Sequence, residues 1–267
     1  MMPPQLKELT VEAISDFIRT HVGDSKATGV VVGLSGGIDS AVVTKLCVDS
    51  LGPEKVLNVF LPSPTTPEQD LEDVRRMSRD WGTTLLVYDI GPLLKSYNLI
   101  MPGSECKEVA GNLMARIRMA ILYAHANLDS RLVIGTGNKS ELLMGYFTKW
   151  GDGGADLLPI GDLYKTEVRE LARLIGVPES IIDKEPSAGL WEGQTDESEM
   201  GISYDDLDQV LSGLEEQTSL DVISKRTGVP MALVEMVSEK NACSRHKRRM
   251  PLIPKLGLRT VGCDWRE

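Results

Sequence analysis

The sequence lacks long hydrophobic runs, which excludes a membrane-spanning helix. Its longest apolar stretches, residues 29–34 and 55–61, are far shorter than the roughly 20 residues that a helix needs to cross a bilayer. The first seven residues contain no basic stretch followed by an apolar segment. We therefore expect no signal peptide, no membrane partner and a cytoplasmic protein.

Cysteine is scarce, and the four cysteines do not form a pattern. No two of them have the CxxC spacing of a zinc knuckle or a redox dithiol. We expect them to be reduced thiols; they are Cys47, Cys106, Cys243 and Cys263.

The sequence has fewer basic than acidic residues. The 29 Lys and Arg residues face 39 Asp and Glu residues, for a net charge of −10. Nucleic-acid-binding proteins usually present a basic face, so this balance argues against a nucleic-acid partner. An acidic protein still binds ATP where Mg²⁺ and a few well-placed lysines offset the local repulsion.

Short β-branched segments alternate with helical ones in the first two thirds of the chain. The predicted strands are residues 29–34, 55–61, 84–90 and 131–135. Among the helices predicted between them are residues 10–22, 41–48 and 107–126. This alternation predicts an α/β fold in which a doubly wound parallel sheet is flanked by helices.

The last third of the chain has a different pattern. Strand signals end near residue 203, and helices are expected around residues 207–214, 220–226 and 231–240. This predicts a helical C-terminal part. The polar, acidic segment 186–200 is too long for a tight connection, so we expect a lid or an ordered-on-binding loop. Residues 251–258 are expected to pack as an extended tail.

The hexapeptide from Ser35 to Ser40 follows the first predicted strand and opens a helix. Ligands of open parallel sheets bind beyond the carboxyl ends of the strands, which is where this loop lies. Gly36 and Gly37 allow the backbone to approach a phosphate closely, and the helix N-terminus offers N–H groups. The loop has no Walker lysine, which disfavours ordinary γ-phosphate transfer. The alternative is a tight turn in which Asp39 and Ser40 cap the helix.

Two further segments point to the same crevice. Residues 135–141 (GTGNKSE) follow the fourth predicted strand, and Glu141 is placed to join Asp39 in holding Mg²⁺. The alternative is that Glu141 only decorates the first turn of a helix. Residues 145–160 combine glycines, aspartates and aromatic side chains in an irregular loop, for which the alternative is a surface Ω-loop.

In order and spacing, these motifs together resemble the NAD synthetase family. They are SGGIDS, GNLMARIR, GTGNKSE, FTKWGDGGAD, KEPSA and HKRR. The resemblance implies an adenine nucleotide alpha hydrolase-like fold of the N-type ATP pyrophosphatases. It also implies that ATP activates the carboxylate of deamido-NAD as an adenylate, and that ammonia then displaces AMP to form NAD.

The resemblance also implies roles for individual residues. Asp39 and Lys165 are the candidate catalytic residues, and Asp39 and Glu141 would hold Mg²⁺. The positions implied to bind ATP are Gly33, Leu34, Ser35, Gly36, Gly37, Ile38, Asp39, Ser40, Thr136, Lys165 and Ser187. Those implied to bind deamido-NAD are Arg116, Lys149, Asp156, His246 and Lys247.

Further implications concern assembly and the nitrogen donor. Family members bind the dinucleotide across a homodimer interface, for which the long helix carrying Arg116 is a candidate. Residues 1–267 are expected to form a single NAD synthetase domain without an N-terminal glutaminase domain, so free ammonia should be the donor. Ile38 replaces a glutamine of many members and is expected to face away from phosphate.

Several alternatives remain open at the level of sequence. Without the motif, Lys165 would be a solvated helix residue, and residues 246–249 a basic surface run. The base that deprotonates ammonium is Asp156 or another carboxylate. The rival functions are a tRNA-modifying thiolase or lysidine-type ligase, which would need a basic face, and a non-enzymatic ATP sensor.

Overall fold

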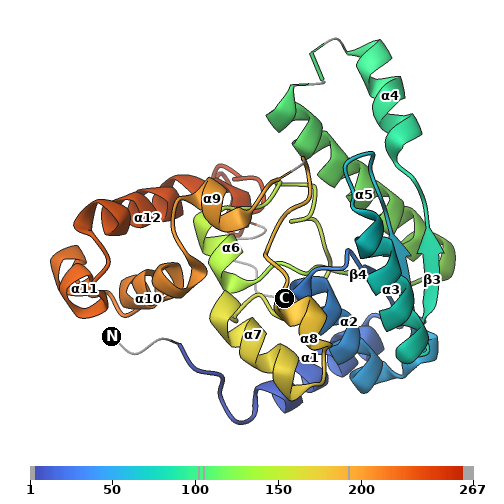
Figure 1. Ribbon diagram of the computed structural model, residues 1–267, viewed down its shortest axis with the longest axis horizontal. Coiled ribbons are helices and arrows are strands. Elements are labelled where there is room, and N and C mark those ends of the chain that lie inside the picture. The colour runs from blue at the N-terminus through green and yellow to red at the C-terminus, as the bar shows by residue number, and fades with distance from the viewer. Residues whose placement is uncertain (1–3, 102, 105, 192, 261–267) are drawn as a thin grey trace.

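The structure is a computed structural model that describes residues 4–260 except 102, 105 and 192. At its centre is a sheet of four parallel strands in the order β3-β2-β1-β4 (Figure 1). The strands are β1 (Val30–Gly33), β2 (Val56–Phe60), β3 (Thr84–Val87) and β4 (Leu132–Ile134). All four lie within the predicted segments, which confirms the α/β fold class.

Continuous apolar strands form here because helices cover both faces of the sheet. Val30 and Val32 pack with α1 (Thr10–Asp24), α2 (Ile38–Leu51), α3 (Glu68–Asp80), α7 (Lys165–Leu174) and α8 (Glu179–Ile182). Val31 points to the opposite face, where the covering helices are α4 (Gly91–Ile100) and α5 (Lys107–Asp129). The 3₁₀ turn η1 (Pro53–Lys55) leads into β2.

The C-terminal part is helical, as predicted, and has a hydrophobic cluster of its own. Tyr204, Leu207 and Val234 are buried in it. Its elements lie to one side of the sheet in Figure 1. They are α6 (Lys139–Met144), α9 (Asp196–Met200), α10 (Tyr204–Glu215), α11 (Leu220–Thr227), α12 (Met231–Cys243) and the 3₁₀ turn η2 (Ser244–Arg248).

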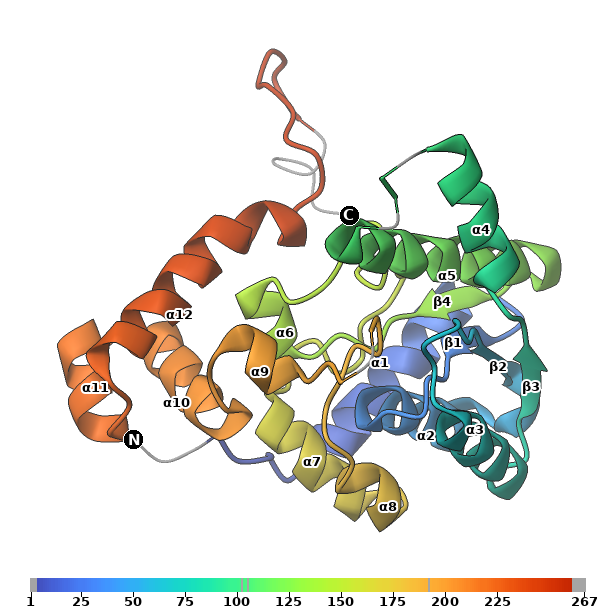
Figure 2. The same ribbon diagram turned by 45° about the horizontal axis from the view of Figure 1, so that its top comes forward.

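The expectation of a packed C-terminal tail was wrong. Leu252, Leu256 and Leu258 are 83%, 90% and 94% exposed, and Figure 2 shows the segment after η2 extending away from α12. Apolar composition suggested packing, but among the described residues no helix or strand lies against these leucines. Prolines at positions 251 and 254 also keep the segment from forming a helix that would present one apolar face.

The strand order reverses at β1, and this reversal positions the site. The chain winds from β1 through β2 to β3 and then crosses back to place β4 on the other side of β1. The loops that leave the carboxyl ends of β1 and β4 therefore diverge and leave a crevice between them, as in other open α/β sheets.

The structure describes three of the four cysteines and allows the prediction of no membrane-spanning helix to be examined. Cys47, Cys106 and Cys243 are free thiols, whereas Cys263 lies outside the described residues. No helix in the described part of the chain is both long enough and apolar enough to cross a membrane.

Candidate active site

A cavity of about 680 Å³ opens at the carboxyl ends of β1 and β4. Its walls come from the loops after these two strands, the irregular loop before α7, and the segment between α8 and α9. Most of the residues predicted for ATP line it: Gly33, Leu34, Ser35, Gly37, Ile38, Asp39, Ser40, Thr136, Lys165 and Ser187. Gly36 is not among the lining residues, and binding of ATP by this set stays a prediction.

Hydrogen bonds within the loop from Ser35 to Ser40 and a close contact with α3 define its shape. Gly36 has a φ of +88°, and a Cβ there would lie 3.3 Å from the backbone oxygen of Asp70. Ser40 Oγ donates to Gly37 O at 2.9 Å and accepts from Ser35 N at 3.1 Å. In the described part of the chain no side chain caps α2 at its N-cap residue, Gly37, so the capping alternative is wrong and the first-turn N–H groups can bind an anion.

Asp39 lies on the first turn of α2 and binds two partners across the crevice. Lys165 Nζ donates to Asp39 Oδ2, and Asn138 Nδ2 donates to Oδ1 at 3.0 Å. Lys165 Nζ also lies 3.6 Å from Glu141 Oε1. The other Glu141 oxygen accepts from Asn138 N at 3.2 Å and completes a capping box on α6. Glu141 therefore caps a helix and also faces the site.

The buried charges of this group alter one another. Burial, with the nearby Asp39 charge, raises the pKa of Glu141 to about 8. Burial alone would lower the pKa of Lys165, but the charges of Asp39 and Glu141 hold it above its usual value. Lys165 is 1% exposed, so the alternative of a solvated helix residue is wrong.

This pair of carboxylates suits a divalent cation. Mg²⁺ in nucleotide sites usually takes one or two protein carboxylates and completes its shell with water and phosphate oxygens. Asp39 and Glu141 both approach the same Lys165 ammonium, so they are close enough to share a cation. Among the described residues, no group of three or more acidic, His or Cys side chains is arranged to hold a metal. The two carboxylates are a donor set of the size that Mg²⁺ takes from a protein in nucleotide sites.

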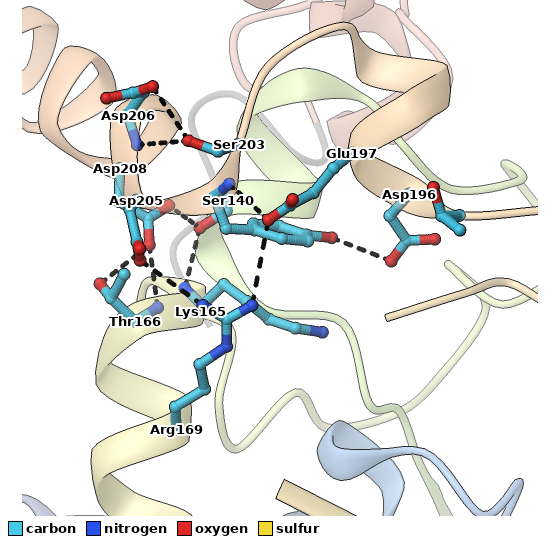
Figure 3. Close-up of polar contacts among 12 residues, drawn as sticks. Ser140, Lys165, Thr166, Arg169, Asp196, Glu197, Ser203, Asp205, Asp206 and Asp208 are labelled. Carbon is cyan, nitrogen blue, oxygen red and sulfur yellow. Dashed lines mark hydrogen bonds and ion pairs between the residues drawn. The ribbon is translucent and has the colours of Figure 1, made fainter. Parts of the chain in front are cut away.

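The buried Asp208 fixes the position of the N-terminus of α7, where Lys165 is the first residue (Figure 3). Asp208 on α10 accepts from Ser140 Oγ at 2.5 Å and from Thr166 N at 2.9 Å. Ser140 Oγ in turn accepts from Lys165 N at 2.9 Å. Asp208 thereby joins α6, α7 and α10 at the point where Lys165 enters the site.

Sequence reasoning assigned no role to Lys184, which also lines the cavity. Its Nζ donates to the Gly36 carbonyl at 3.3 Å, forms an ion pair with Asp70, and lies 3.7 Å from Asp73 Oδ2. The KEPSA motif contains this residue, but the contact with Gly36 joins segments 148 positions apart and has no signal in the sequence.

The sequence also offered no indication of a role for Asp196 and its neighbours. Tyr204 Oη donates to Asp196 Oδ2 at 3.1 Å, while the buried Asp196 Oδ1 has no hydrogen-bond partner among the described residues. Tyr146 Oη and Gln194 Nε2 donate to Glu199 at 2.6 and 2.8 Å. Residues 196–200 of this segment form α9, and whether the segment acts as a lid stays a prediction.

Three of the residues predicted to bind deamido-NAD form one chain of contacts, and the fourth, Lys247, follows the last of them in the sequence. Arg116 Nη2 donates to Lys149 O at 3.4 Å, and Lys149 Nζ donates to His246 O at 2.6 Å. Lys247 Nζ donates to Gly145 O at 2.7 Å and Phe147 O at 2.9 Å. Of these four, Lys247 lines the main cavity, and it shares a second hollow of about 370 Å³ with His246.

Asp156, the fifth residue predicted for deamido-NAD, lies apart from the other four. Its carboxylate accepts from Tyr123 Oη at 3.0 Å and from Val133 N at 2.8 Å. It is outside the set of described residues that line the cavity. Arg116, Lys149 and His246 are outside that set as well, so the role of Asp156 in binding deamido-NAD stays a prediction.

The irregular loop is packed at its glycines, whereas Trp150, Asp152 and Asp156 are exposed. Asp152 Oδ1 accepts from Thr148 N at 2.9 Å. A Cβ on Gly153 would lie 2.5 Å from the Phe147 ring, and one on Gly151 would lie 2.8 Å from Ala115 Cβ. Gly151 is therefore required for close packing against α5 and Gly153 for packing within the loop, and Gly151, Asp152 and Gly154 line the cavity.

Comparisons with known proteins agree with this geometry. The profile of the NAD synthase family matches residues 10–251. The chain belongs to this family. It is 50% identical over 250 residues to the NH(3)-dependent NAD(+) synthetase of Archaeoglobus fulgidus, covering 93% of this chain and 97% of that protein.

Two solved structures of the NAD synthase family share the fold. An NMN synthetase from Francisella tularensis is 36% identical, with a TM-score of 0.83 and coverage of 92% of this chain and 98% of that one. An NH3-dependent NAD synthetase from Campylobacter jejuni is 34% identical, with a TM-score of 0.79 and coverage of 92% and 97%. Family membership confirms the resemblance and removes the thiolase, lysidine-type ligase and ATP-sensor alternatives.

Proposed function

We propose that this chain amidates deamido-NAD with free ammonia, using ATP and releasing NAD, AMP and pyrophosphate. The observation that carries the proposal is the buried Lys165 between Asp39 and Glu141, beside a glycine loop at a helix N-terminus. A lysine and two carboxylates that can hold Mg²⁺ are groups that stabilise charge on a transferring phosphoryl group. Relatives of nearly full coverage are NH(3)-dependent NAD(+) synthetases, which supports ammonia as the donor.

In the first step, the nicotinate carboxylate of deamido-NAD attacks the α-phosphorus of ATP, and pyrophosphate leaves. Loop N–H groups and the positive end of the α2 dipole bind the departing pyrophosphate. Lys165 donates to the α-phosphate, where charge increases in the transition state. The loop residues, Thr136 and Ser187 position ATP.

Asp39 and Glu141 would hold Mg²⁺, which when bound neutralises phosphate charge and orients the phosphates for in-line attack. Asp39 and Glu141 themselves present their carboxylates to the cavity. Hydrogen bonds from Asn138 and Lys165 fix the positions of these carboxylates. In the second step, ammonia attacks the activated carbonyl and AMP leaves. Positioning, rather than a covalent enzyme intermediate, accounts for the rate.

For deamido-NAD we propose the cluster of Arg116, Lys149, His246 and Lys247, with Asp156 contributing from its separate place. The cationic residues concentrate positive charge beside the cavity in a chain whose net charge is −10, which favours an anionic substrate. We further propose that residues 1–267 act as one synthetase domain in a homodimer, with a second subunit completing the dinucleotide site through α5.

One solved relative is named an NMN synthetase, and this makes a mononucleotide substrate the second candidate. The two substrates share the nicotinate carboxylate that is activated and differ in the adenylyl half. A chain that uses the cluster around Lys149 for the adenylyl half should prefer the dinucleotide.

A product assay tests the proposal. Purified protein supplied with ATP, Mg²⁺, ammonium and deamido-NAD should form NAD, AMP and pyrophosphate. Formation of ADP and phosphate would contradict the mechanism. Equal rates with glutamine would contradict ammonia as the donor, and a higher kcat/KM with nicotinate mononucleotide would identify the second candidate.

A further inference from the structure

Lys184 makes an interaction that the proposed function does not use. It follows α8, at the start of the segment that leads to α9, yet its ammonium reaches the carbonyl of Gly36 in the loop after β1. It also forms ion pairs with Asp70 and Asp73 on α3. Three separate segments of the cavity wall therefore meet at one ammonium group.

The hydrogen bond from Lys184 to the Gly36 carbonyl orients the peptide group between Gly36 and Gly37. In a trans peptide the C=O and N–H bonds point in opposite directions. A lysine that holds the Gly36 carbonyl on one side therefore directs the Gly37 N–H to the other side. That N–H donates to Ser35 Oγ at 3.3 Å, a long hydrogen bond that a phosphate oxygen can replace.

Gly36 has little freedom to adopt another arrangement while Lys184 is in place. Its φ of +88° is open to glycine, and Asp70 backbone and side-chain atoms lie 3.3 to 3.4 Å from the position of a Cβ. Glycine itself has no steric preference between this conformation and its alternatives. A neighbouring contact must select the conformation, and the Lys184 ammonium is the charged group that touches the Gly36 carbonyl.

We propose that Lys184 is a positioning residue for the pyrophosphate site, which it forms by fixing the Gly36–Gly37 peptide so that the Gly37 N–H faces the phosphates. The inference rests on the proposed function for the identity of the bound group. Asp70 and Asp73 hold the ammonium at this place through charge, so the segment before α9 and the loop after β1 adopt their binding geometry together.

The test compares Lys184→Met, which keeps the length of the side chain but removes its charge, with Lys184→Arg, which restores charged donors. We expect Lys184→Met to weaken binding of magnesium pyrophosphate, measured by calorimetry, about tenfold. The KM for ATP should rise by a similar factor, whereas the KM for ammonium should stay within about twofold. Lys184→Arg should recover part of the pyrophosphate affinity.

Lys45→Met is the matched control, because Lys45 pairs with Asp49 on α2 and does not line the cavity. Unchanged pyrophosphate affinity in Lys184→Met would overturn the proposal. So would equal increases in KM for ATP and ammonium together with a lowered melting temperature, because these would indicate a structural tether. If the wild-type chain binds pyrophosphate but forms no NAD, the proposed function fails separately.

Discussion

Asp39 is the residue on which the site depends most, because it touches Lys165 and Asn138 and faces the cavity. Replacing Asp39 with Ala should lower kcat for NAD formation by more than about a hundredfold, since a preorganised charge is lost next to the transferring phosphoryl group. The measurement is NAD formation at saturating substrates, with a thermal melt of each protein.

Lys7→Ala serves as the control for Asp39→Ala, because Lys7 is exposed and outside the cavity. It should leave the rate unchanged. Equal loss of rate in both variants would show that the assay reports folding rather than chemistry.

Glu141 should make stability depend on pH in the metal-free protein. Burial raises its pKa from 4.5 to about 8, so between these values the folded state binds more protons than the unfolded state. Stability contributed by the protonated form is therefore lost as the pH rises through this window, at no more than about 1.4 kcal/mol per pH unit. Glu141→Gln should remove this slope in urea denaturation curves measured with a chelator, and an unchanged slope would contradict the assignment.

At the scale of elements, Asp208 links α6, α7 and α10 through hydrogen bonds to Ser140 and Thr166. Asp208→Ala would leave buried donors unpaired and should cost roughly 3 kcal/mol in urea denaturation. It should also lower kcat, because the backbone N–H of Lys165 donates to the same Ser140 hydroxyl.

Asp205→Ala is the matched control on the same helix, because the Asp205 side chain is 75% exposed. We expect it to change stability by less than about 0.5 kcal/mol. Similar losses for the two substitutions would show that α10 depends on helix charge rather than on the buried network.

The elements were predictable where a local pattern determines them. Valines in sequence, as in β1, indicate a strand buried on both faces, and periodic apolar residues indicated α10, α11 and α12. Residues 196–200, DESEM, have too little apolar periodicity to predict α9, which depends on the Thr195 cap and on contacts such as Tyr204 with Asp196.

The candidate site was predictable only in part for a related reason. Glycine spacing and strand position located the loop after β1, but the contacts of Asn138 with Asp39 and of Lys184 with Gly36 join residues about 100 or more positions apart. No local pattern reports such pairs. Likewise, the hydrogen bond from the backbone N–H of Val133 to the Asp156 carboxylate joins two segments 23 positions apart and could not be read from the sequence.

At the scale of the whole molecule, the surface carries an apolar region that a monomer would leave exposed to water. Leu99 and Ile100 at the end of α4 are 85% and 81% exposed, and Val109 on the adjacent α5 is also exposed. Large exposed apolar patches often mark protein interfaces. This region adjoins the helix that carries Arg116, which is the proposed dimer helix.

The purified chain should therefore have twice its mass of 29.3 kDa in light scattering coupled to size-exclusion chromatography. Leu99→Glu combined with Ile100→Glu should shift the mass toward one chain, because burying two carboxylates at an interface is costly. The same protein should lose affinity for deamido-NAD but retain ATP binding, since the second subunit is proposed to complete only the dinucleotide site. Leu256→Glu in the exposed tail should change neither property, and a wild-type monomer with full activity would contradict the shared site.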